Sequence, residues 1–231
     1  MMVGLMTLAA TASAQSGKAS SDLGGWNSVW VEWNPGTFKV DVKDADNQSF
    51  NGFSAGYSHA FRIMSSTPVY AEVGLGVQYS HYEEKYQEER EGYYIGDEWI
   101  DNYWVETYES LDMWAVKIPI NMLYKYDVPN SPVSLIPFVG VNLRYNVSAN
   151  IHDNRGDRYG EPGMTEYDPF DEKDMGSSKN TWKHFQLGWN IGVKASFGKH
   201  IMAGLSYGND LSEIAKKTKI STTTVSVGYV F

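Results

Sequence analysis

Strict alternation between bulky apolar side chains and small or polar ones runs through most of this chain. In segment 53–63, one face carries Phe53, Tyr57 and Phe61, and the opposite face carries only Gly, Ser, Ala and Arg. The same period of two recurs in further segments: 69–80, 114–126, 135–147, 184–197, 201–207 and 224–231. A less regular segment, 28–33, supplies one more. A period of two is that of a β-strand whose two faces meet different surroundings, so the sequence predicts eight strands.

The connections between these segments are alternately short and long. Short connections fall at 65–68, 127–134 and 198–200, and long ones at about 34–50, 81–110, 148–180 and 209–219. This alternation is typical of outer-membrane barrels, which have short periplasmic turns and long extracellular loops. We therefore predict an all-β fold, an eight-stranded antiparallel up-and-down transmembrane β-barrel. It would be integral to the cell outer membrane, with extracellular loops and periplasmic termini.

A soluble barrel or sandwich is the alternative, because it too alternates apolar and polar residues. In a soluble barrel the bulky apolar side chains point inward and the outside is charged. Here the polar face is rich in Gly, Ser and Ala, which suits a narrow interior and leaves the bulky side chains to face lipid. Aromatic residues also gather near strand ends, where the interfacial girdles of membrane barrels lie: Tyr79, Trp114, Tyr124, Tyr126, Tyr145, Phe197, Tyr207, Tyr229 and Phe231.

The start of the chain has the character of an export signal. Residues 1–14 are apolar or small and end with Ala12-Ser13-Ala14, the pattern of a signal-peptide cleavage site. They lack the positively charged beginning of such a peptide, so we expect the true start to lie upstream. We assign 1–14 to a signal peptide, 15–27 to an N-terminal lead-in and 28–231 to the barrel. Beyond residue 15 no stretch approaches the roughly 18 consecutive apolar residues of a membrane-spanning helix, which leaves strands to cross a membrane.

Composition narrows the functions that the chain could have. It has no cysteine, which excludes a disulfide framework, thiolate catalysis and cysteine-based metal sites. It carries 19 Lys and Arg against 28 Asp and Glu, a net charge of -9, whereas nucleic-acid binding needs a basic surface. No cofactor and no metal are expected, because two groups of polar residues lack the Gly and Glu that complete a calcium-binding loop. These groups are Asp44, Asp46, Asn47 and Asp153, Asn154, Asp157.

Three motifs give the chain a family resemblance. Segment 117–126 has an apolar-Pro-apolar core that ends in Lys125-Tyr126, and segment 136–141 continues with Pro-aromatic-apolar-Gly. The chain closes with apolar or aromatic residues at alternate positions: Val225, Val227, Tyr229 and Phe231. Over about residues 28–231 it resembles the porin-like outer membrane β-barrel domain family of small Gram-negative barrels. The resemblance implies the fold, the location and recognition of the terminal motif by the barrel-assembly machinery, but no single activity.

Polar and charged residues at the small-residue positions are expected to point into the barrel. An eight-stranded barrel has an interior just wide enough to be filled by side chains, so these groups should pair with one another rather than line a pore. A gated conduit for small molecules is the alternative. The polar network predicted for the lumen comprises Arg62, Glu72, Lys117, Lys125, Asn142, Arg144, Gln186, Asn190 and Lys194.

Two of the predicted loops concentrate negative charge. Loop 81–110 holds ten acidic residues against two basic ones, and loop 148–180 holds eight against four. Aromatic residues are interleaved with the acids, and this combination suits a cationic partner, a sugar or a divalent cation. We favour the simpler interpretation, that the strands continue above the membrane as a solvated, charged hairpin, because charged faces usually only solvate. The binding candidates are Glu83, Glu84, Glu88, Glu89, Trp99, Trp104, Asp153 and Asp157.

We therefore expect a non-enzymatic outer-membrane barrel with a plugged interior and a structural, adhesive or surface-binding role. Its expected neighbours are outer-membrane lipid and lipopolysaccharide, and the identity of any extracellular ligand stays open. A small porin-like transport barrel is the first alternative. The second is a lipid-A-modifying enzyme, which would use His184 with a serine and a carboxylate at the outer rim. None of the five histidines has a local nucleophile signature, so no catalytic residue is assigned.

Overall fold

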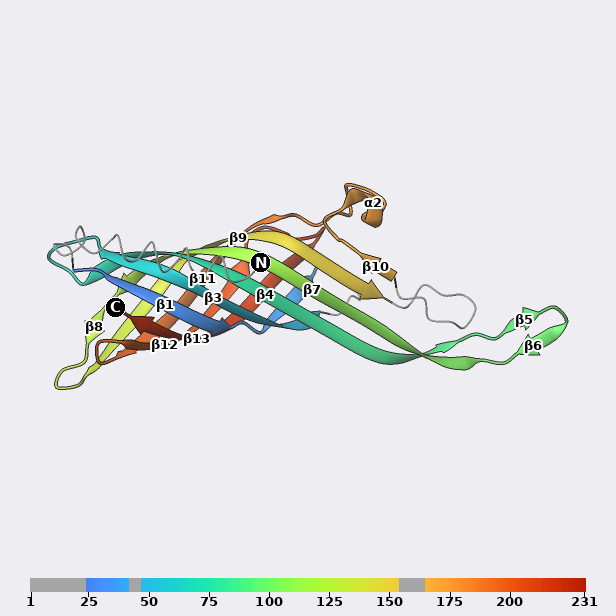
Figure 1. Cartoon of the computed structure of the whole chain (residues 1–231), viewed down its shortest axis with the longest axis horizontal. Helices are drawn as coiled ribbons and strands as arrows, with labels where there is room; N and C mark the ends of the chain where they lie inside the picture. The colour runs from blue at the N-terminus through green and yellow to red at the C-terminus, as the bar shows by residue number, and fades with distance from the viewer. Residues whose placement is uncertain (1–23, 42–46, 154–164) are drawn as a thin grey trace.

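The computed structural model describes residues 24–41, 47–153 and 165–231, and its strands close into a barrel (Figure 1). The wall is formed by β1 (Trp26–Trp33), β2 (Gly36–Val40), β3 (Gln48–Arg62), β4 (Val69–Arg90), β7 (Tyr103–Tyr124), β9 (Val133–Asp153), β11 (Phe185–Phe197), β12 (Ile201–Asp210) and β13 (Thr218–Val230). The smaller elements are β5 (Tyr93–Ile95), β6 (Glu98–Ile100), β8 (Tyr126–Asp127), β10 (Thr165–Tyr167) and α2 (Glu172–Met175). Within these ranges no helix is both long and apolar enough to span a membrane. The signal peptide predicted at 1–14 lies outside the described residues.

In the described chain, eight strand positions form the ring, because β1 and β2 occupy one position in turn. β1 pairs with β13 on one side and with β3 on the other, so that Val29 lies opposite both Tyr229 and Tyr57. β2 continues between the same two neighbours. The break between β1 and β2 includes Pro35, which has no N–H to donate to a neighbouring strand. Around the ring the order is β1, β13, β12, β11, β9, β7, β4 and β3, which confirms the predicted eight-stranded antiparallel barrel.

The two ends of the barrel differ in the length of their connections. The short turns 63–68, 128–132 and 198–200 lie at the end where β1 begins and β13 finishes. At that end Asn27 and Phe231 exchange backbone hydrogen bonds of 3.3 and 2.9 Å. The long connections lie at the opposite end, as an up-and-down barrel with an even number of strands requires.

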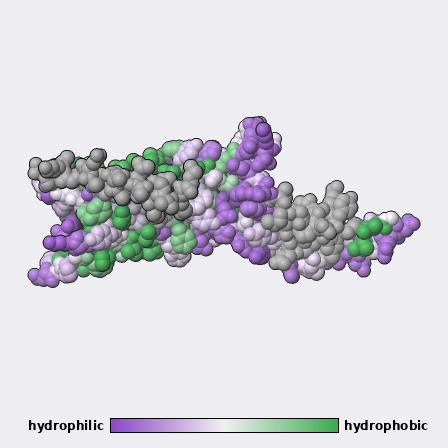
Figure 2. All heavy atoms as spheres, viewed as in Figure 1, coloured by the Kyte–Doolittle hydropathy of each residue, from purple (hydrophilic) through white to green (hydrophobic). Residues whose placement is uncertain are grey.

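Side chains on the wall alternate between exposed and buried positions. On β4, Tyr70, Glu72 and Gln78 are at most 8% exposed, whereas Val73 and Leu75 are 43% and 57% exposed. Figure 2 shows apolar residues gathered over the barrel and hydrophilic ones where the longest strands leave it. Bulky apolar side chains on the outside and polar groups inside are the arrangement of a barrel that faces lipid.

Strands β4 and β7 continue far beyond the rest of the wall (Figure 1). They stay paired out to Arg90 and Tyr103, whereas β3 leaves β4 at His81 and β9 leaves β7 at Glu109. We call the projecting part, residues 82–108, the β4–β7 hairpin. A second small sheet, β5 and β6, forms its tip.

Segment 81–110, predicted as a long connection, is thus strand for most of its length, and this agrees with the interpretation that the strands continue above the membrane as a hairpin. Tyr82 and Thr107 are buried at the base of the hairpin. Beyond this base, both faces of a projecting hairpin meet water, so its strands show no alternation of apolar and polar residues by which to detect them. Three other predicted loops also contain strand. Loop 34–50 includes β2 and the start of β3, β9 continues into 148–180, and β13 begins inside 209–219.

Candidate functional site

Three ion pairs cross the interior of the barrel. In each pair the nitrogen–oxygen distance is 2.6 or 2.7 Å, and the pairs are Lys117–Glu32, Lys194–Glu72 and Arg144–Asp210. All six side chains are 16% exposed or less. A charge buried in a confined space is costly unless it is paired and hydrogen-bonded. Here three cations meet three carboxylates, so these six groups balance in charge.

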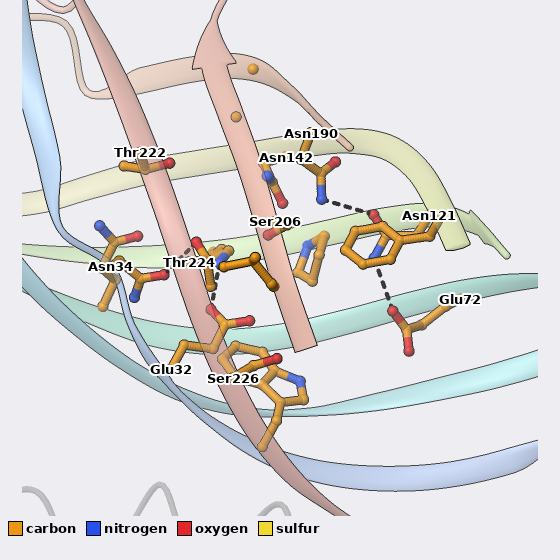
Figure 3. A pocket seen from close by; sticks show the side chains of 18 of the residues that line it. Glu32, Asn34, Glu72, Asn121, Asn142, Asn190, Ser206, Thr222, Thr224 and Ser226 are labelled. Carbon is orange, nitrogen blue, oxygen red and sulfur yellow. Dashed lines mark hydrogen bonds and ion pairs between the residues drawn. The ribbon is translucent and has the colours of Figure 1, made fainter. Parts of the chain in front are cut away.

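The carboxylate of Glu72 is the most completely bonded of the three. Lys194 Nζ donates to both of its oxygens at 2.7 and 2.8 Å, Asn121 Nδ2 donates at 2.8 Å and Ser58 Oγ at 3.3 Å. Asn121 Oδ1 in turn accepts from Asn190 Nδ2 at 3.1 Å. Figure 3 shows Glu72, Asn121 and Asn190 joined in this order. The network ties β3, β4, β7 and β11 together at one level of the barrel.

The other two carboxylates lie in similar networks. Glu32 also accepts from Ser54 Oγ at 2.8 Å, and Ser54 Oγ accepts from Asn34 Nδ2 at 2.8 Å. Beside Asp210, Arg144 Nε donates to Gln186 Oε1 at 2.8 Å. Gln186 is fully buried, which fits a side chain held inside rather than at a solvated pore wall.

Trp30 fills the interior beside Lys117, and two glycines make room for it. Lys117 Nζ lies 5.6 Å from the centre of the Trp30 ring, within the range of a cation–π contact. A Cβ placed on Gly56 or on Gly76 would lie 2.4 Å from an atom of that ring. Only glycine at these two positions lets the indole lie against the wall.

Apolar clusters close both ends of the polar layer. Towards the long connections the buried cluster comprises Phe38, Phe50, Tyr82, Leu111, Met113, Ala149, Ile151, Ile214 and Ile220. Phe170 and Trp182, from the connection between β9 and β11, pack against this cluster. Towards the short turns the buried cluster comprises Ala60, Tyr70, Leu123, Ile136, Phe138 and Met202. The interior is thus a polar layer between two apolar ones.

A cavity remains in the polar layer, with a volume of about 70 Å³. Its lining includes Glu32 and Glu72, which are labelled in Figure 3, and also Lys117, Arg144 and Lys194. A buried water needs about 10–15 Å³ measured in this way, so the space suits a few waters bonded to polar groups.

The β4–β7 hairpin carries the acidic residues at successive heights. Near its base Glu83 lies 2.9 Å from Lys85 Nζ, which holds the pKa of the Glu83 carboxyl below its usual value, and Glu84 accepts a hydrogen bond from the Tyr82 hydroxyl. Higher up, Glu89 accepts from Asn102 Nδ2 at 3.4 Å. The acids therefore lie along the hairpin rather than converging on one point. Among the described residues no group of three His, Cys, Asp or Glu side chains could hold a metal ion.

Exposed aromatic residues lie at the far end of the same hairpin. Trp104, opposite Glu89 on the neighbouring strand, is 65% exposed. In the tip, Trp99 is 50% exposed and its ring centre lies 4.8 Å from that of Tyr94. Trp99 Nε1 donates to Asp101 at 3.0 Å. The far end of the hairpin therefore exposes large aromatic side chains next to carboxylates.

A family model described as an outer membrane protein beta-barrel domain matches residues 2–231. The chain belongs to this family. It is therefore an integral outer-membrane β-barrel of Gram-negative type, as the motifs in segments 117–126 and 225–231 had led us to expect. No curated protein matches the chain.

Solved structures of other outer-membrane barrels are similar in fold to this one. Ail, the attachment invasion locus protein of Yersinia pestis, in complex with the heparin analogue sucrose octasulfate, is 14% identical; the match covers 90% of this chain and 99% of Ail, with a TM-score of 0.43. Neisserial surface protein A is 16% identical over 89% of this chain and 97% of that one, with a TM-score of 0.40. A major outer membrane protein from Thermus thermophilus is 13% identical over 89% and 99%, with a TM-score of 0.43.

Most residues predicted for the lumen of this outer-membrane barrel are brought together. Glu72, Lys117, Arg144, Gln186, Asn190 and Lys194 join the networks described above, and Asn142 lines the cavity. Arg62 and Lys125 do not join them, and the expectation for these two is corrected. Arg62 Nε donates to the carbonyl of Thr67, and Lys125 lies 3.4 Å from Asp127. Both lie next to short turns, where partners are local and water is near.

Sequence reasoning missed several residues of the interior, among them Glu32, Asp210 and Asn121 of the polar networks. Glu32 lies in the least regular predicted strand, and Asp210 fell inside a predicted loop. Asn121 stands on the small-residue face of its strand between Lys117 and Leu123, and that position was the signal that could have identified it.

The remaining candidates are placed as follows. Asp153 ends β9, opposite Thr165 of β10. Asp157 lies outside the described residues, as do Asp44, Asp46 and Asn154, and the side chain of Glu88 is not described either. The terminal residues Val225, Val227, Tyr229 and Phe231 all face outward and are 42–54% exposed.

His184, the residue considered for a lipid-A-modifying enzyme, is held by structural contacts. Its Nδ1 lies 2.7 Å from the carbonyl oxygen of Asn146. Its ring stacks on Phe170 and Tyr145, with centres 4.4 and 5.4 Å apart. A catalytic histidine would present Nδ1 to a carboxylate and Nε2 to a nucleophile, and the first of these places is taken by a backbone carbonyl.

Proposed function

We propose that this protein is a non-conducting, non-enzymatic outer-membrane barrel that presents the β4–β7 hairpin to the outside of the cell as a binding surface. In this orientation the short turns and both termini are periplasmic. The observation that carries the proposal is the filled interior: a polar layer of three ion pairs lies between two apolar clusters.

The interior layers argue against the transport alternative. A solute would have to pass the cluster around Ile214 and Ile220, which are at most 1% exposed, and then displace ion-paired side chains. Breaking one buried ion pair by removing a partner costs about 3–5 kcal/mol. A transport barrel would contain a water-filled channel in place of these layers.

The hairpin has the reach and the chemistry of a binding element. β4 continues for nine residues after its last pairing with β3 at His81, and at about 3.3 Å per residue it projects roughly 30 Å. The lipid headgroups add only about 5–8 Å on each side of the hydrocarbon core, so the tip stands clear of them. Residues 82–108 carry nine acidic side chains against two basic ones, which favours a cationic partner.

Planar-bilayer recordings test the first half of the proposal. We expect the purified protein to give no reproducible single-channel steps at moderate voltage. Regular steps of one amplitude would overturn the plugged interior and favour the transport barrel.

Binding to poly-L-lysine, with uncharged dextran as a comparison, tests the second half. Glu83 and Ser110 lie opposite each other, so residues 84–109 can be replaced by an Asn-Gly turn that leaves the barrel closed. We expect the parent protein to bind poly-L-lysine in a salt-sensitive manner, and the shortened variant to lose most of that binding. A second test variant combines Glu83→Gln, Glu84→Gln and Glu89→Gln in the hairpin. Its matched control removes the same number of charges outside the hairpin, by Glu166→Gln, Glu172→Gln and Glu213→Gln. Equal losses in both triple variants, or stronger binding to dextran, would contradict a cation-binding hairpin.

A further inference from the structure

On the outward face of β13 and of the neighbouring β1 and β2, residue types change from apolar to hydroxyl-bearing to cationic towards the long connections. Along β13 the alternate residues read Val227, Val225, Thr223, Ser221 and Lys219. Along β1 and β2 the alternate residues run from Val29, Val31 and Trp33 through Thr37 to Lys39. Apolar, hydroxyl and cationic residues thus follow one another at matching heights, because Thr37 lies opposite Ser221 and Lys39 opposite Lys219.

A groove of about 480 Å³ lies at the height where hydroxyls replace apolar side chains. Its lining includes Thr37, Lys39, Ser49, Tyr207, Ser221 and Thr223, and no carboxylate is found among its described lining residues. The Tyr207 hydroxyl accepts from Ser221 Oγ at 2.8 Å and from Lys39 Nζ at 3.3 Å. These contacts hold the Lys39 ammonium over the groove.

Two lysines directly opposite each other on neighbouring strands repel, which destabilises the pair unless an anion lies between or beside them. In the part of the chain that the structure describes, neither Lys39 nor Lys219 forms an ion pair with a carboxylate. The turn between β12 and β13 adds Lys216 and Lys217. Among the described residues the nearby acids are Asp41, Glu213 and Asp210; Asp210 interacts with Lys219 but is paired with Arg144 inside the barrel. Within the described chain, this corner is therefore positive on a protein whose net charge is -9.

On the side of the groove that faces the short turns, the outer surface of the wall is apolar and suits contact with acyl chains. Leu205 and Val225 lie opposite each other there and are 55% and 42% exposed. A phosphate in the groove would therefore lie immediately above an apolar surface, as it does in a phospholipid or a phosphorylated glycolipid. This continuity favours a lipid over a free anion.

We infer that the groove between β12, β13, β2 and β3 binds the phosphate group of a phosphorylated glycolipid of the outer leaflet, the chemistry of lipid A. Lys39 and Lys219 supply the positive charge, the hydroxyls of Thr37 and Thr223 supply hydrogen bonds, and the acyl chains lie against Leu205 and Val225. The choice of leaflet rests on the proposed orientation, whereas the chemistry of the groove does not.

Native mass spectrometry of the protein in detergent micelles with added lipid A tests the inference. Each lysine near an anionic lipid contributes roughly fivefold to binding, so Lys39→Gln with Lys219→Gln should weaken lipid A retention roughly thirtyfold. The matched control, Lys173→Gln with Lys179→Gln, removes the same charge from the α2 region and should retain lipid A as the parent does. The heat-induced mobility shift on gels verifies that all variants are folded.

Three results would overturn the inference: unchanged retention in the groove variant, equal losses in the control variant, or equal retention of a lipid A from which both phosphates have been removed. Inorganic phosphate, titrated separately, should bind far more weakly than lipid A, and equal affinity would indicate a free-anion site. Micelles have no leaflets, so a negative result would count against the groove and leave the orientation of the barrel untouched.

Discussion

Lys194 on β11 donates two hydrogen bonds to Glu72 on β4, across the interior and 122 positions apart in the chain. The contact joins strands that are not neighbours in the ring. It exists only when the barrel has closed, so its loss should destabilise the whole fold.

Replacing Lys194 alone should destabilise the barrel more than replacing the pair. Lys194→Met leaves Glu72 buried without its cation, a loss of about 3–5 kcal/mol, whereas Lys194→Met with Glu72→Leu should recover most of that stability. Urea unfolding in detergent micelles, followed by tryptophan fluorescence, measures both. Equal stability of the single variant and the parent would show that the ion pair is not a structural element.

The fit of Trp30 against the wall should depend on two glycines. Gly56→Ala or Gly76→Ala places a methyl group where the indole lies, and overpacking of this kind costs about 1–3 kcal/mol. We expect a lower unfolding midpoint and an altered Trp fluorescence spectrum. Ala55→Val, on the exposed face of the same strand, is the control and should leave both unchanged. A normal midpoint in both glycine variants would mean that Trp30 lies elsewhere.

A pH effect is expected at the base of the hairpin. His81 and Asp112 lie opposite each other beyond the aromatic pair Tyr79 and Trp114, on the side of the long connections. Burial raises the pKa of Asp112, but hydrogen bonds from Tyr79 and His81 outweigh it and hold the pKa below the ordinary 3.8. A depressed pKa in the folded state stabilises the fold above about pH 3.8, and this contribution is lost as the pH falls through the folded value.

Carboxyl carbon chemical shifts of the protein in micelles measure this titration. The Asp112 carboxyl should titrate below 3.8, the ordinary value for an aspartate, and Tyr79→Phe should raise its pKa. A pKa at or above 3.8 in the parent would contradict the hydrogen-bonded arrangement.

The final residue should matter for assembly rather than for stability. Phe231 is 48% exposed and makes no contribution to either interior cluster. We expect Phe231→Ala to lower the amount of folded protein in outer-membrane fractions several-fold, with rescue by Phe231→Tyr. Refolding of purified protein into detergent should proceed as in the parent. A refolding defect of the same size would assign Phe231 a structural role instead.

The sequence predicted the wall of the barrel well because each wall strand separates two environments. Val73 and Leu75 meet lipid while Glu72 and Gln78 meet the interior, and this contrast produces a period of two. The period disappears in the β4–β7 hairpin, where most side chains meet water, so alternation follows β4 only to residue 80. Its continuation as a hairpin was inferred from the charged character of the segment. The apolar cluster around Phe38, Phe50 and Ile220 was missed because these residues lie beyond the lipid-facing band, in β2 and near the starts of β3 and β13.

The lumen was predicted in part, for a related reason. Alternation identifies which side a residue faces, and it placed Lys117, Arg144 and Lys194 correctly on the interior side. It cannot identify the partner, which comes from a strand far away in the sequence, and so Glu32 and Asp210 were not paired with them. Alternation also does not indicate where along a strand the interior ends, which is why Arg62 and Lys125 were included in the predicted lumen network.

The three buried ion pairs connect β7 with β1, β11 with β4 and β9 with β12, and in no case are the two strands neighbours in the ring. They therefore act as diagonal cross-braces that fix the circumference of the barrel. Flattening the cylinder or admitting a ninth strand at the β1–β13 seam would pull at least one brace apart. A barrel braced in this way keeps a closed ring of eight strands, so the elements that stand outside the ring are the ones that can change without disturbing it.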